Sequence, residues 1–242
     1  EGQEFTAETV AQALGEEKRA TVQCLSAELG QRQQLVAAVS VERLGAQKLS
    51  GYRFRHHLFQ KYFYDHLDPI QRYHLHEAVG SAMEALYGEA PDRLSALAPR
   101  LAWHFEMAGL AERAAAYHLR AGSQAARVSA HTEAVAHLRR GLALLEPLPD
   151  TPERTRLKLD LYLAVAHPLS MMRGFWDPER IHALNCAYQL AQHADLSNSP
   201  ERCAPLAAVA YFALWSAQTG DALAIGNDIR QLAEREQNEH AT

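Results

Sequence analysis

The chain has 242 residues, of which 48% are hydrophobic and 22% are charged, so it can bury a sizeable core, and collagen-like, low-complexity and fully disordered classes are excluded. Its 24 Lys and Arg residues stand against 29 Asp and Glu residues, a formal charge of −5, so we expect no direct contact with nucleic acid. No segment approaches the roughly 18 to 20 consecutive apolar residues of a membrane helix, and the N-terminus lacks the features of a secretory signal, so we expect a cytoplasmic location and no membrane partner.

Proline usage indicates two domains, because only Pro69 of the ten prolines precedes residue 90. We therefore expect domains over residues 1–90 and 91–242. The first residues lead directly into a helical pattern and the last residues form a helical pattern without a stop signal, so we expect a piece of a longer protein. The three cysteines form no CxxC pair and are expected to be small core residues in a reducing compartment: Cys24, Cys186 and Cys203.

The first half predicts short helices followed by a small β-hairpin. Thr6 is a suitable N-cap for a helix that ends at Gly15, a second helical pattern covers residues 17–30, and a third short helix is expected around Leu35 and Val36. Alternating apolar residues then predict a hairpin, with Val39 and Val41 on one strand and Tyr52 and Phe54 on the other. This order is typical of a winged-helix domain.

Two further helices are expected to complete the first domain. The first, over residues 57–67, carries Leu58, Phe59, Tyr62 and Phe63 on one stripe, and the second follows Asp68 and Pro69 and continues to Gly88. We expect the apolar faces of both helices to cover the small domain.

The second half is predicted to be helical throughout, with turns near residues 109, 130, 150, 174, 198 and 220. Small residues at Ala114 and Ala121 are expected to leave room for the rings of Trp103 and Phe105 on the preceding helix. Hairpins of about 34 to 47 residues favour a tetratricopeptide-like array of helix pairs. The fold prediction is therefore mostly α: a winged-helix domain with a small β-hairpin, followed by tetratricopeptide-like helical repeats.

Sites for metal or catalysis receive little support. Five histidines lie between His56 and His76, but their spacing matches neither a helix-borne zinc pair nor a Cys/His pattern, so we expect no metal. The chain has no GxSxG, HExxH, GxGxxG or Walker-type motif, so we expect no enzyme and no cofactor of its own. The acidic residues that could flank a cleft are expected to lie on a solvated face: Asp65, Asp68, Glu77 and Glu84.

Two kinds of binding surface remain open. A winged helix can enter a DNA groove, yet the basic residues available for phosphate contacts are few: Arg32, Lys48, Arg53, Arg55 and Lys61. Most aromatic residues of the second half are expected in the interhelical core. The exception is the turn over residues 171–176, where Met171, Met172, Phe175 and Trp176 surround a glycine and are hard to bury completely; we expect these four to bind a ligand or partner.

Residues 52–88 resemble the end of the winged-helix domain of STAND-type regulatory nucleoside triphosphatases. The resemblance rests first on the pattern Y-x-F-R-H-x-L, followed by a tyrosine and a leucine and then by R-x-x-L-H, at Tyr52, Phe54, Arg55, His56, Leu58, Tyr64, Leu67, Arg72, Leu75 and His76. Residues 101–125 and 133–149 also resemble the helical repeats of the same proteins. The resemblance is strongest over residues 52–146, includes the opening residues 1–10, and continues at pattern level beyond residue 150.

This resemblance implies a regulatory, non-catalytic segment of the kind found in large transcriptional regulators. In such proteins the winged helix relays nucleotide state and the repeats bind a protein or a small-molecule inducer. ADP or ATP would be bound only by a separate N-terminal ATPase domain. His56, with Arg55, occupies the place of the family's nucleotide-sensing histidine, although His57 stands where an aspartate is expected. The alternative is a fragment of a DNA-binding winged-helix transcription factor.

Overall fold

The computed structural model describes residues 2–45 and 47–193, and within this range the chain is mostly helical with one small antiparallel sheet. The predicted turns near residues 198 and 220, and Cys203, lie outside the described residues. The chain divides into two compact units, Glu1–Tyr117 and His118–Thr242, and each is described by itself. The predicted boundary near residue 90 remains a prediction.

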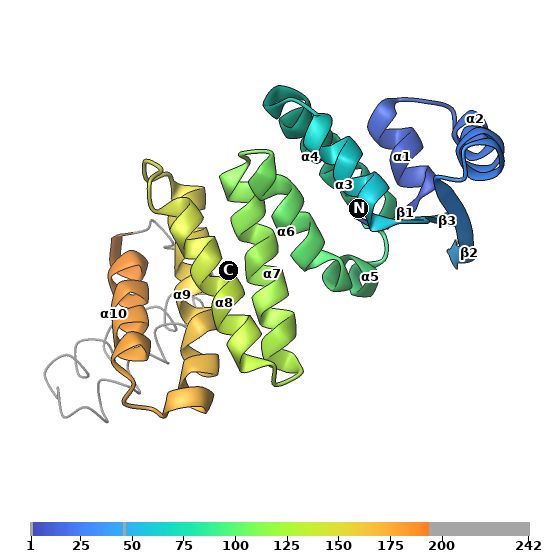
Figure 1. Ribbon diagram of the computed structural model, residues 1–242. Helices are drawn as coiled ribbons and strands as arrows, with labels where there is room; N and C mark the ends of the chain where they lie inside the picture. The colour runs from blue at the N-terminus through green and yellow to red at the C-terminus, as the bar shows by residue number, and fades with distance from the viewer. Residues whose placement is uncertain (1, 46, 194–242) are drawn as a thin grey trace, which may run out of the picture. The chain divides into compact units, whose positions relative to one another are not determined.

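The first unit begins with a strand and two short helical segments, continues with a hairpin, and ends in helices (Figure 1). Its elements are β1 (Glu4–Thr6), α1 (Ala7–Leu14), α2 (Lys18–Gln23), the π-helix η1 (Cys24–Arg32), β2 (Val36–Leu44), β3 (Gln47–Phe54), α3 (His57–His66), α4 (Pro69–Tyr87), α5 (Pro91–Ala96), α6 (Ala98–Met107) and the first part of α7 (Ala111–Arg127).

The predicted hairpin is confirmed as β2 and β3, and the short strand β1 adds to its other edge in the order β1-β3-β2. All pairs are antiparallel, and a register shift between Ala38 and Ser40 gives β2 a bulge. Opposite this bulge, Gly51 leaves room for Ser40, because a Cβ on Gly51 would lie 2.5 Å from the Ser40 hydroxyl oxygen.

The first predicted helix is confirmed with both of its ends. Thr6 accepts a hydrogen bond from the Thr9 backbone N–H at 3.4 Å, and Gly15 ends α1 in the left-handed region at φ 68°. Its buried residues are the small Ala7 and Ala11 together with Glu8 and Thr9.

The third predicted helix is wrong. Val36 begins strand β2 and is 2% exposed, while the Leu35 backbone N–H donates to the Leu29 carbonyl and the Leu35 carbonyl accepts from Arg55. Pairing with β3 therefore determines the conformation here, and Gln34 turns the chain at φ 54°.

The second predicted helix exists, but it changes from α to π winding at Cys24 and continues to Arg32. Cys24 is exposed and Cys186 is partly exposed, so the expectation that both are core residues is wrong for Cys24.

Helices α3 and α4 lie close to their predicted positions. Asp68 caps α4 by accepting from the backbone N–H groups of Ile70 and Gln71, each at 2.9 Å. The expectation that α3 covers the domain is wrong, because none of its residues is buried and Leu58 and Tyr62 are 63% and 58% exposed. Helix α4 instead packs against α1 and α6.

A glycine allows α4 and α6 to approach closely. A Cβ on Gly80 would lie 2.8 Å from a ring carbon of Phe105, which is fully buried and stacks on Tyr117 with ring centroids 5.5 Å apart.

Ala114 is buried as expected, but Trp103 is 45% exposed, so the prediction that Trp103 lies in the core is wrong. Trp103 is two residues before Phe105 on α6, about 200° around the helix, and therefore cannot share its buried face.

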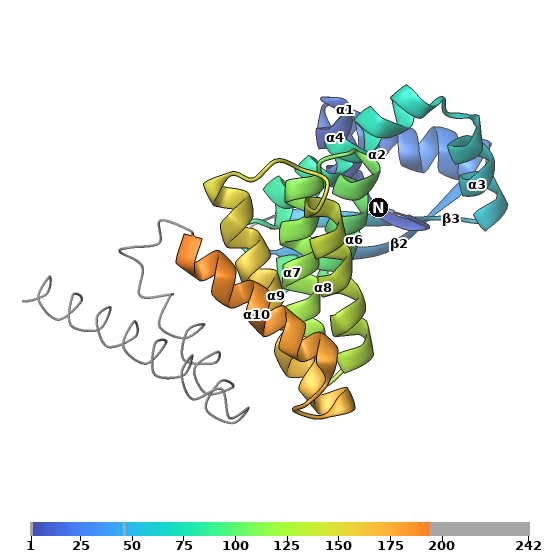
Figure 2. The ribbon, with the colours of Figure 1, turned by 90° about the vertical axis from the view of Figure 1, so that its left-hand side faces the viewer.

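In the second unit, the C-terminal part of α7 is followed by α8 (His131–Leu145), α9 (Pro152–Arg173) and α10 (Pro178–His193), with turns at the predicted places near residues 130, 150 and 174. Helix α9 contacts both α8 and α10, and the three lie side by side (Figures 1 and 2). Glycines again allow close spacing of the helices: Gly122 faces Leu138, and Gly141 faces Leu161.

Within the described residues, no helix has the length and apolar character needed to cross a membrane.

Candidate functional site

Arg55 and His56 lie where β3 leads into α3. The Arg55 Nε–H donates to the Val36 carbonyl at 3.3 Å, and its backbone N–H donates to the Leu35 carbonyl at 2.9 Å, so Arg55 ties this junction to the start of β2. His56 is the N-cap residue of α3, but its side chain makes no capping hydrogen bond. Its exposed ring meets Phe59 edge-on at 5.7 Å. The imidazole is thus supported by an aromatic ring and can donate to an anionic ligand.

The second predicted site lies at the end of α9 and the turn that follows. We call Met171, Met172, Phe175 and Trp176 the Met-aromatic turn; their exposed fractions are 51%, 40%, 58% and 57%. The structure brings these four residues together at one turn and leaves all of them exposed, as the sequence predicts. Gly174 adopts φ 88° and ψ 171° between the two methionines and the two rings.

Charged residues hold the backbone of the Met-aromatic turn. Asp177 caps α10 by accepting from the backbone N–H groups of Glu179 and Arg180 at 3.1 and 3.2 Å. The Arg180 guanidinium donates to the Phe175 carbonyl at 2.8 Å and lies 5.1 Å from the centre of the Phe175 ring. Glu179 pairs with Arg139 of α8 and with Arg173 of α9. The exposed apolar side chains therefore stand on a fixed framework.

A buried chain of polar rings in the first unit was not predicted. Tyr64 Oη lies 3.0 Å from His76 Nε2, and His76 Nδ1 lies 3.0 Å from His104 Nδ1. His76 is 5% and His104 is 4% exposed. Burial lowers the pKa of His76 and lowers that of His104 to about 3, so both imidazoles are neutral near pH 7.

The sequence marks only part of this chain of rings. Tyr64, Arg72 and His76 belong to the pattern that carries the family resemblance, and Arg72 lies over the Tyr64 ring at 4.8 Å. His104 is 28 residues beyond His76 on another helix, and nothing in its local sequence indicates the pairing. A similar contact links α7 and α8 in the second unit, where His118 Nδ1 lies 3.1 Å from His137 Nδ1.

The acidic residues expected on a solvated face are partly structural. Glu84 pairs with Arg113 and accepts a hydrogen bond from Tyr117 Oη at 2.6 Å, while the Arg113 guanidinium lies 3.9 Å from the Phe105 ring centre. Asp68 is the cap of α4. Glu84 thus joins α4 to α7, Asp68 stabilises the start of α4, and the two do not converge on a cleft.

Two of the candidate phosphate-binding residues are close to carboxylates. Arg32 pairs with Glu28 at 3.0 Å, and Arg53 lies 3.8 Å from Glu4. A phosphate would compete with these carboxylates for the guanidinium groups, which weakens the case for a DNA-binding face.

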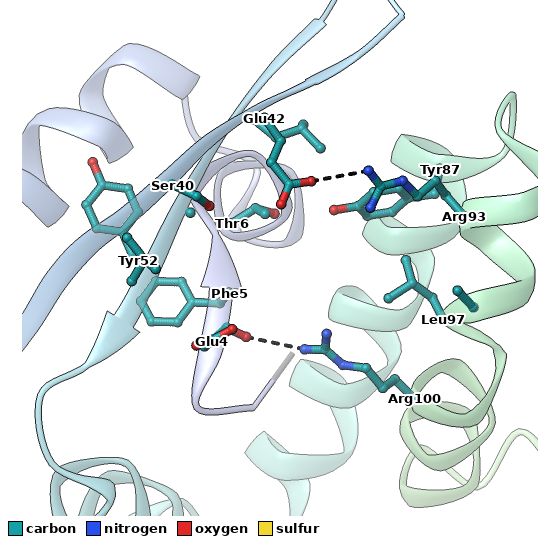
Figure 3. Close-up of a pocket in the computed structure, with 14 residues that line it drawn as sticks. Glu4, Phe5, Thr6, Ser40, Glu42, Tyr52, Tyr87, Arg93, Leu97 and Arg100 are labelled. Carbon is teal, nitrogen blue, oxygen red and sulfur yellow. Dashed lines mark hydrogen bonds and ion pairs between the residues drawn. The ribbon is translucent and has the colours of Figure 1, made fainter.

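A cleft of about 220 Å³ lies between the sheet and the segment from the end of α4 to the start of α6 (Figure 3). Arg93 faces Glu42 across it at 3.6 Å, and the Arg100 guanidinium donates to the Glu4 carbonyl at 3.3 Å. Because two glutamates and two arginines face the cleft, its charges balance.

A larger cavity of about 560 Å³ lies beside η1 and is lined mainly by apolar side chains, including Leu25, Leu29, Phe54 and Phe63. No acidic or basic side chain of the described residues lines this cavity.

Among residues 2–45 and 47–193, no group of three or more His, Cys, Asp or Glu side chains is placed so that it could hold a metal ion.

Comparison of the chain with models of protein families, with curated proteins and with solved structures finds no match. Its function is therefore inferred from its own residues and their geometry.

Proposed function

We propose that the chain is a non-catalytic regulatory and protein-interaction segment of a STAND-type ATPase that acts as a transcriptional regulator in the cytoplasm. Residues 1–90 would form a winged helix that relays the nucleotide state of a separate ATPase domain. Residues 91–242 would form tetratricopeptide-like repeats that bind a protein or a small-molecule inducer. The observation that carries the proposal is the Met-aromatic turn, with four large apolar side chains exposed on a fixed backbone.

The chemistry of the Met-aromatic turn suits a partner surface. Burying a large apolar side chain contributes roughly 1.5 to 3 kcal/mol, so Phe175 and Trp176 together offer a substantial gain to any partner that covers them. The unbranched methionines can adjust to the shape of a partner. The ion pairs of Glu179 with Arg139 and Arg173 keep the turn in place, which reduces the entropy lost on binding.

The first unit supports the winged-helix part of the proposal through its order of elements. Helices α1 and α2 with η1 precede the β2–β3 hairpin, and β1 completes a three-stranded sheet. At the base of this hairpin, exposed His56 has an imidazole that can donate to a diphosphate oxygen.

The interaction role is tested by placing a photo-crosslinking amino acid at Phe175 in the native host and isolating the adducts. We expect one discrete adduct, which Trp176→Ser and Met172→Ser each reduce at least fivefold, because each substitution removes apolar contact area. The matched control places the crosslinker at exposed Arg156, on the same helix as the methionines, where no adduct is expected. Equal labelling at both positions, or no adduct at Phe175, would contradict the proposal.

The nucleotide role is tested in the longer protein that the proposal requires. His56→Ala is expected to speed ADP release or raise basal output, because it removes a donor to the diphosphate. His74→Ala, an exposed histidine of α4, serves as the control. If ADP retention and basal output are the same in both variants and the parent, His56 does not sense nucleotide.

A further inference from the structure

The strongest feature outside the proposed binding surfaces is the buried contact between α4 and α6. His76 and His104 face each other through their Nδ1 atoms at 3.0 Å, and Tyr64 of α3 meets the other nitrogen of His76 at 3.0 Å. Trp103 stands edge-on to both imidazoles, with centroid distances of 4.6 Å to His76 and 4.9 Å to His104.

Whether this contact can form depends on how many protons the two imidazole rings carry, and therefore on pH. A hydrogen bond between two Nδ1 atoms needs one of them to carry a proton and the other to be bare, so the pair bonds only while at least one imidazole is neutral. If both rings are fully protonated, two N–H groups point at each other and two positive charges meet in a buried place. The bond is then lost, and both charges favour exposure to water.

The surrounding charges reinforce this preference for neutral rings. Arg72, on the same helix as His76, disfavours a positive charge on His76. Arg100 of α6 has the same effect on His104. The group facing the pair from α3 is the Tyr64 hydroxyl. Burial is the largest cause of the lowered pKa of both histidines, and the positive charge of the chain's N-terminus is the next. Arg72 then lowers the pKa of His76, and His76 and Arg100 lower that of His104.

We propose that His76 and His104 form an acid-operated latch between α4 and α6: while neutral they bond the two helices, and proton uptake favours the open form, in which the bond is lost and α6 is released from α4. The device acts within the first unit and is independent of the proposed nucleotide and partner sites. The side chains that respond are buried in the closed form, so the latch opens through exposure of the pair to solvent.

The sign and size of the effect follow from linkage. An imidazole with a pKa of about 3 in the closed form and about 6.5 when exposed takes up its proton mainly on opening. The open-to-closed ratio then rises about 30-fold between pH 7.5 and pH 5 for one such ring, and more if both rings respond. The latch is therefore closed above about pH 6.5 and is progressively weakened below it.

The test uses the whole chain with Trp176→Phe and Trp215→Phe, so that Trp103 is the single fluorescent indole. Amide hydrogen exchange of α6, corrected for the intrinsic effect of pH, and Trp103 fluorescence are followed from pH 7.5 to pH 5. We expect the protection of α6 to fall by at least tenfold and Trp103 emission to change in parallel. His104→Asn places a non-titrating amide near Nδ1 and should abolish most of this pH dependence, whereas His74→Asn on exposed α4 surface should not.

A constant protection of α6 over this range would overturn the latch, as would a pH dependence that survives in a folded His104→Asn variant. If His104→Asn does not fold, the unsubstituted chain is tested by ring-nitrogen NMR. A shared Nδ1 proton between His76 and His104 at pH 7.5 that is lost together with α6 protection supports the latch. Two rings that protonate without change in α6 refute it.

Discussion

At the scale of single residues, the close packing of this chain depends on glycines placed opposite large side chains. Gly80 faces Phe105, Gly122 faces Leu138 and Gly141 faces Leu161. In each case the facing side chain occupies the place that a Cβ atom of the glycine residue would take. These glycines lie inside helices, where glycine costs about 1 kcal/mol relative to alanine, so their value is the packing that they permit.

Gly80→Ala is expected to destabilise the chain by about 1 to 3 kcal/mol despite the better helix propensity of alanine, because the new methyl group overlaps the buried Phe105 ring. Urea unfolding followed by circular dichroism measures the loss. Phe105→Leu in the same chain should recover part of it, giving a coupling energy in a double-mutant cycle. Additive effects of the two substitutions would show that the ring is not the obstacle.

At the scale of elements, residues close in sequence were predicted well. The cap of α1 at Thr6 and the start of α4 after Asp68 were identified from the sequence, because capping depends on a side chain and the backbone two or three residues ahead. The turn near residue 109 was identified because Gly109 adopts φ 63°, a conformation that glycine accepts without strain.

What was missed depends on partners distant in sequence. Strand β1 is three residues long and exists because it pairs with β3, about 45 residues further along the chain. Val36 joins a strand for the same reason. The pairing of His76 with His104 needs the packing of α4 on α6, which no local pattern encodes. By contrast, the exposure of the Met-aromatic turn was predictable, because four large apolar residues cannot all face inward from one short turn.

Glu8 connects three elements of the first unit, and its effect on stability should depend on pH. Its carboxylate, 5% exposed, lies 2.9 Å from Lys18 Nζ of α2 and accepts from the Ser50 backbone N–H of β3 at 2.8 Å. Burial alone would raise the pKa of Glu8, but the hydrogen bonds from Lys18 and Ser50 hold it below its ordinary 4.5. Its stabilisation is therefore present above about pH 4.5 and is lost as the pH falls through the lowered pKa.

Glu8→Gln should cost about 1 to 3 kcal/mol of unfolding free energy at pH 7, because a buried charge-assisted contact is replaced by a neutral one. The difference from the parent should shrink below pH 4, as measured by denaturant unfolding at each pH. Glu28→Gln, which removes the exposed pair with Arg32, is the control and should cost less than about 0.5 kcal/mol. A cost for Glu8→Gln that is constant with pH would contradict the charge account.

At the scale of the whole molecule, the formal charge of −5 favours the proposed function over the DNA-binding alternative. Acidic residues outnumber basic ones, and Arg32 and Arg53 lie beside carboxylates. A DNA-binding surface gains affinity by releasing counterions from phosphates, which needs several basic side chains on one face.

We therefore expect no measurable binding of the chain to a labelled 20-base-pair duplex at micromolar concentration and 50 mM salt, as followed by fluorescence anisotropy. Arg53→Gln with Lys48→Gln should leave the result unchanged. Binding that weakens steeply with salt and is reduced in this double variant would favour the alternative function.

Gly174 places a constraint on how the Met-aromatic turn can vary. A Cβ atom at this position would have no other atom within 4 Å, so lack of space does not exclude a larger residue. The backbone conformation, at φ 88° and ψ 171°, does. That region is nearly confined to glycine, and other residues pay about 1 to 3 kcal/mol to occupy it. A substitution here would let the backbone relax and turn the Phe175 and Trp176 rings together, so a single mutational step can change the surface that this loop presents. Keeping the rings in place without the glycine would require compensating changes elsewhere.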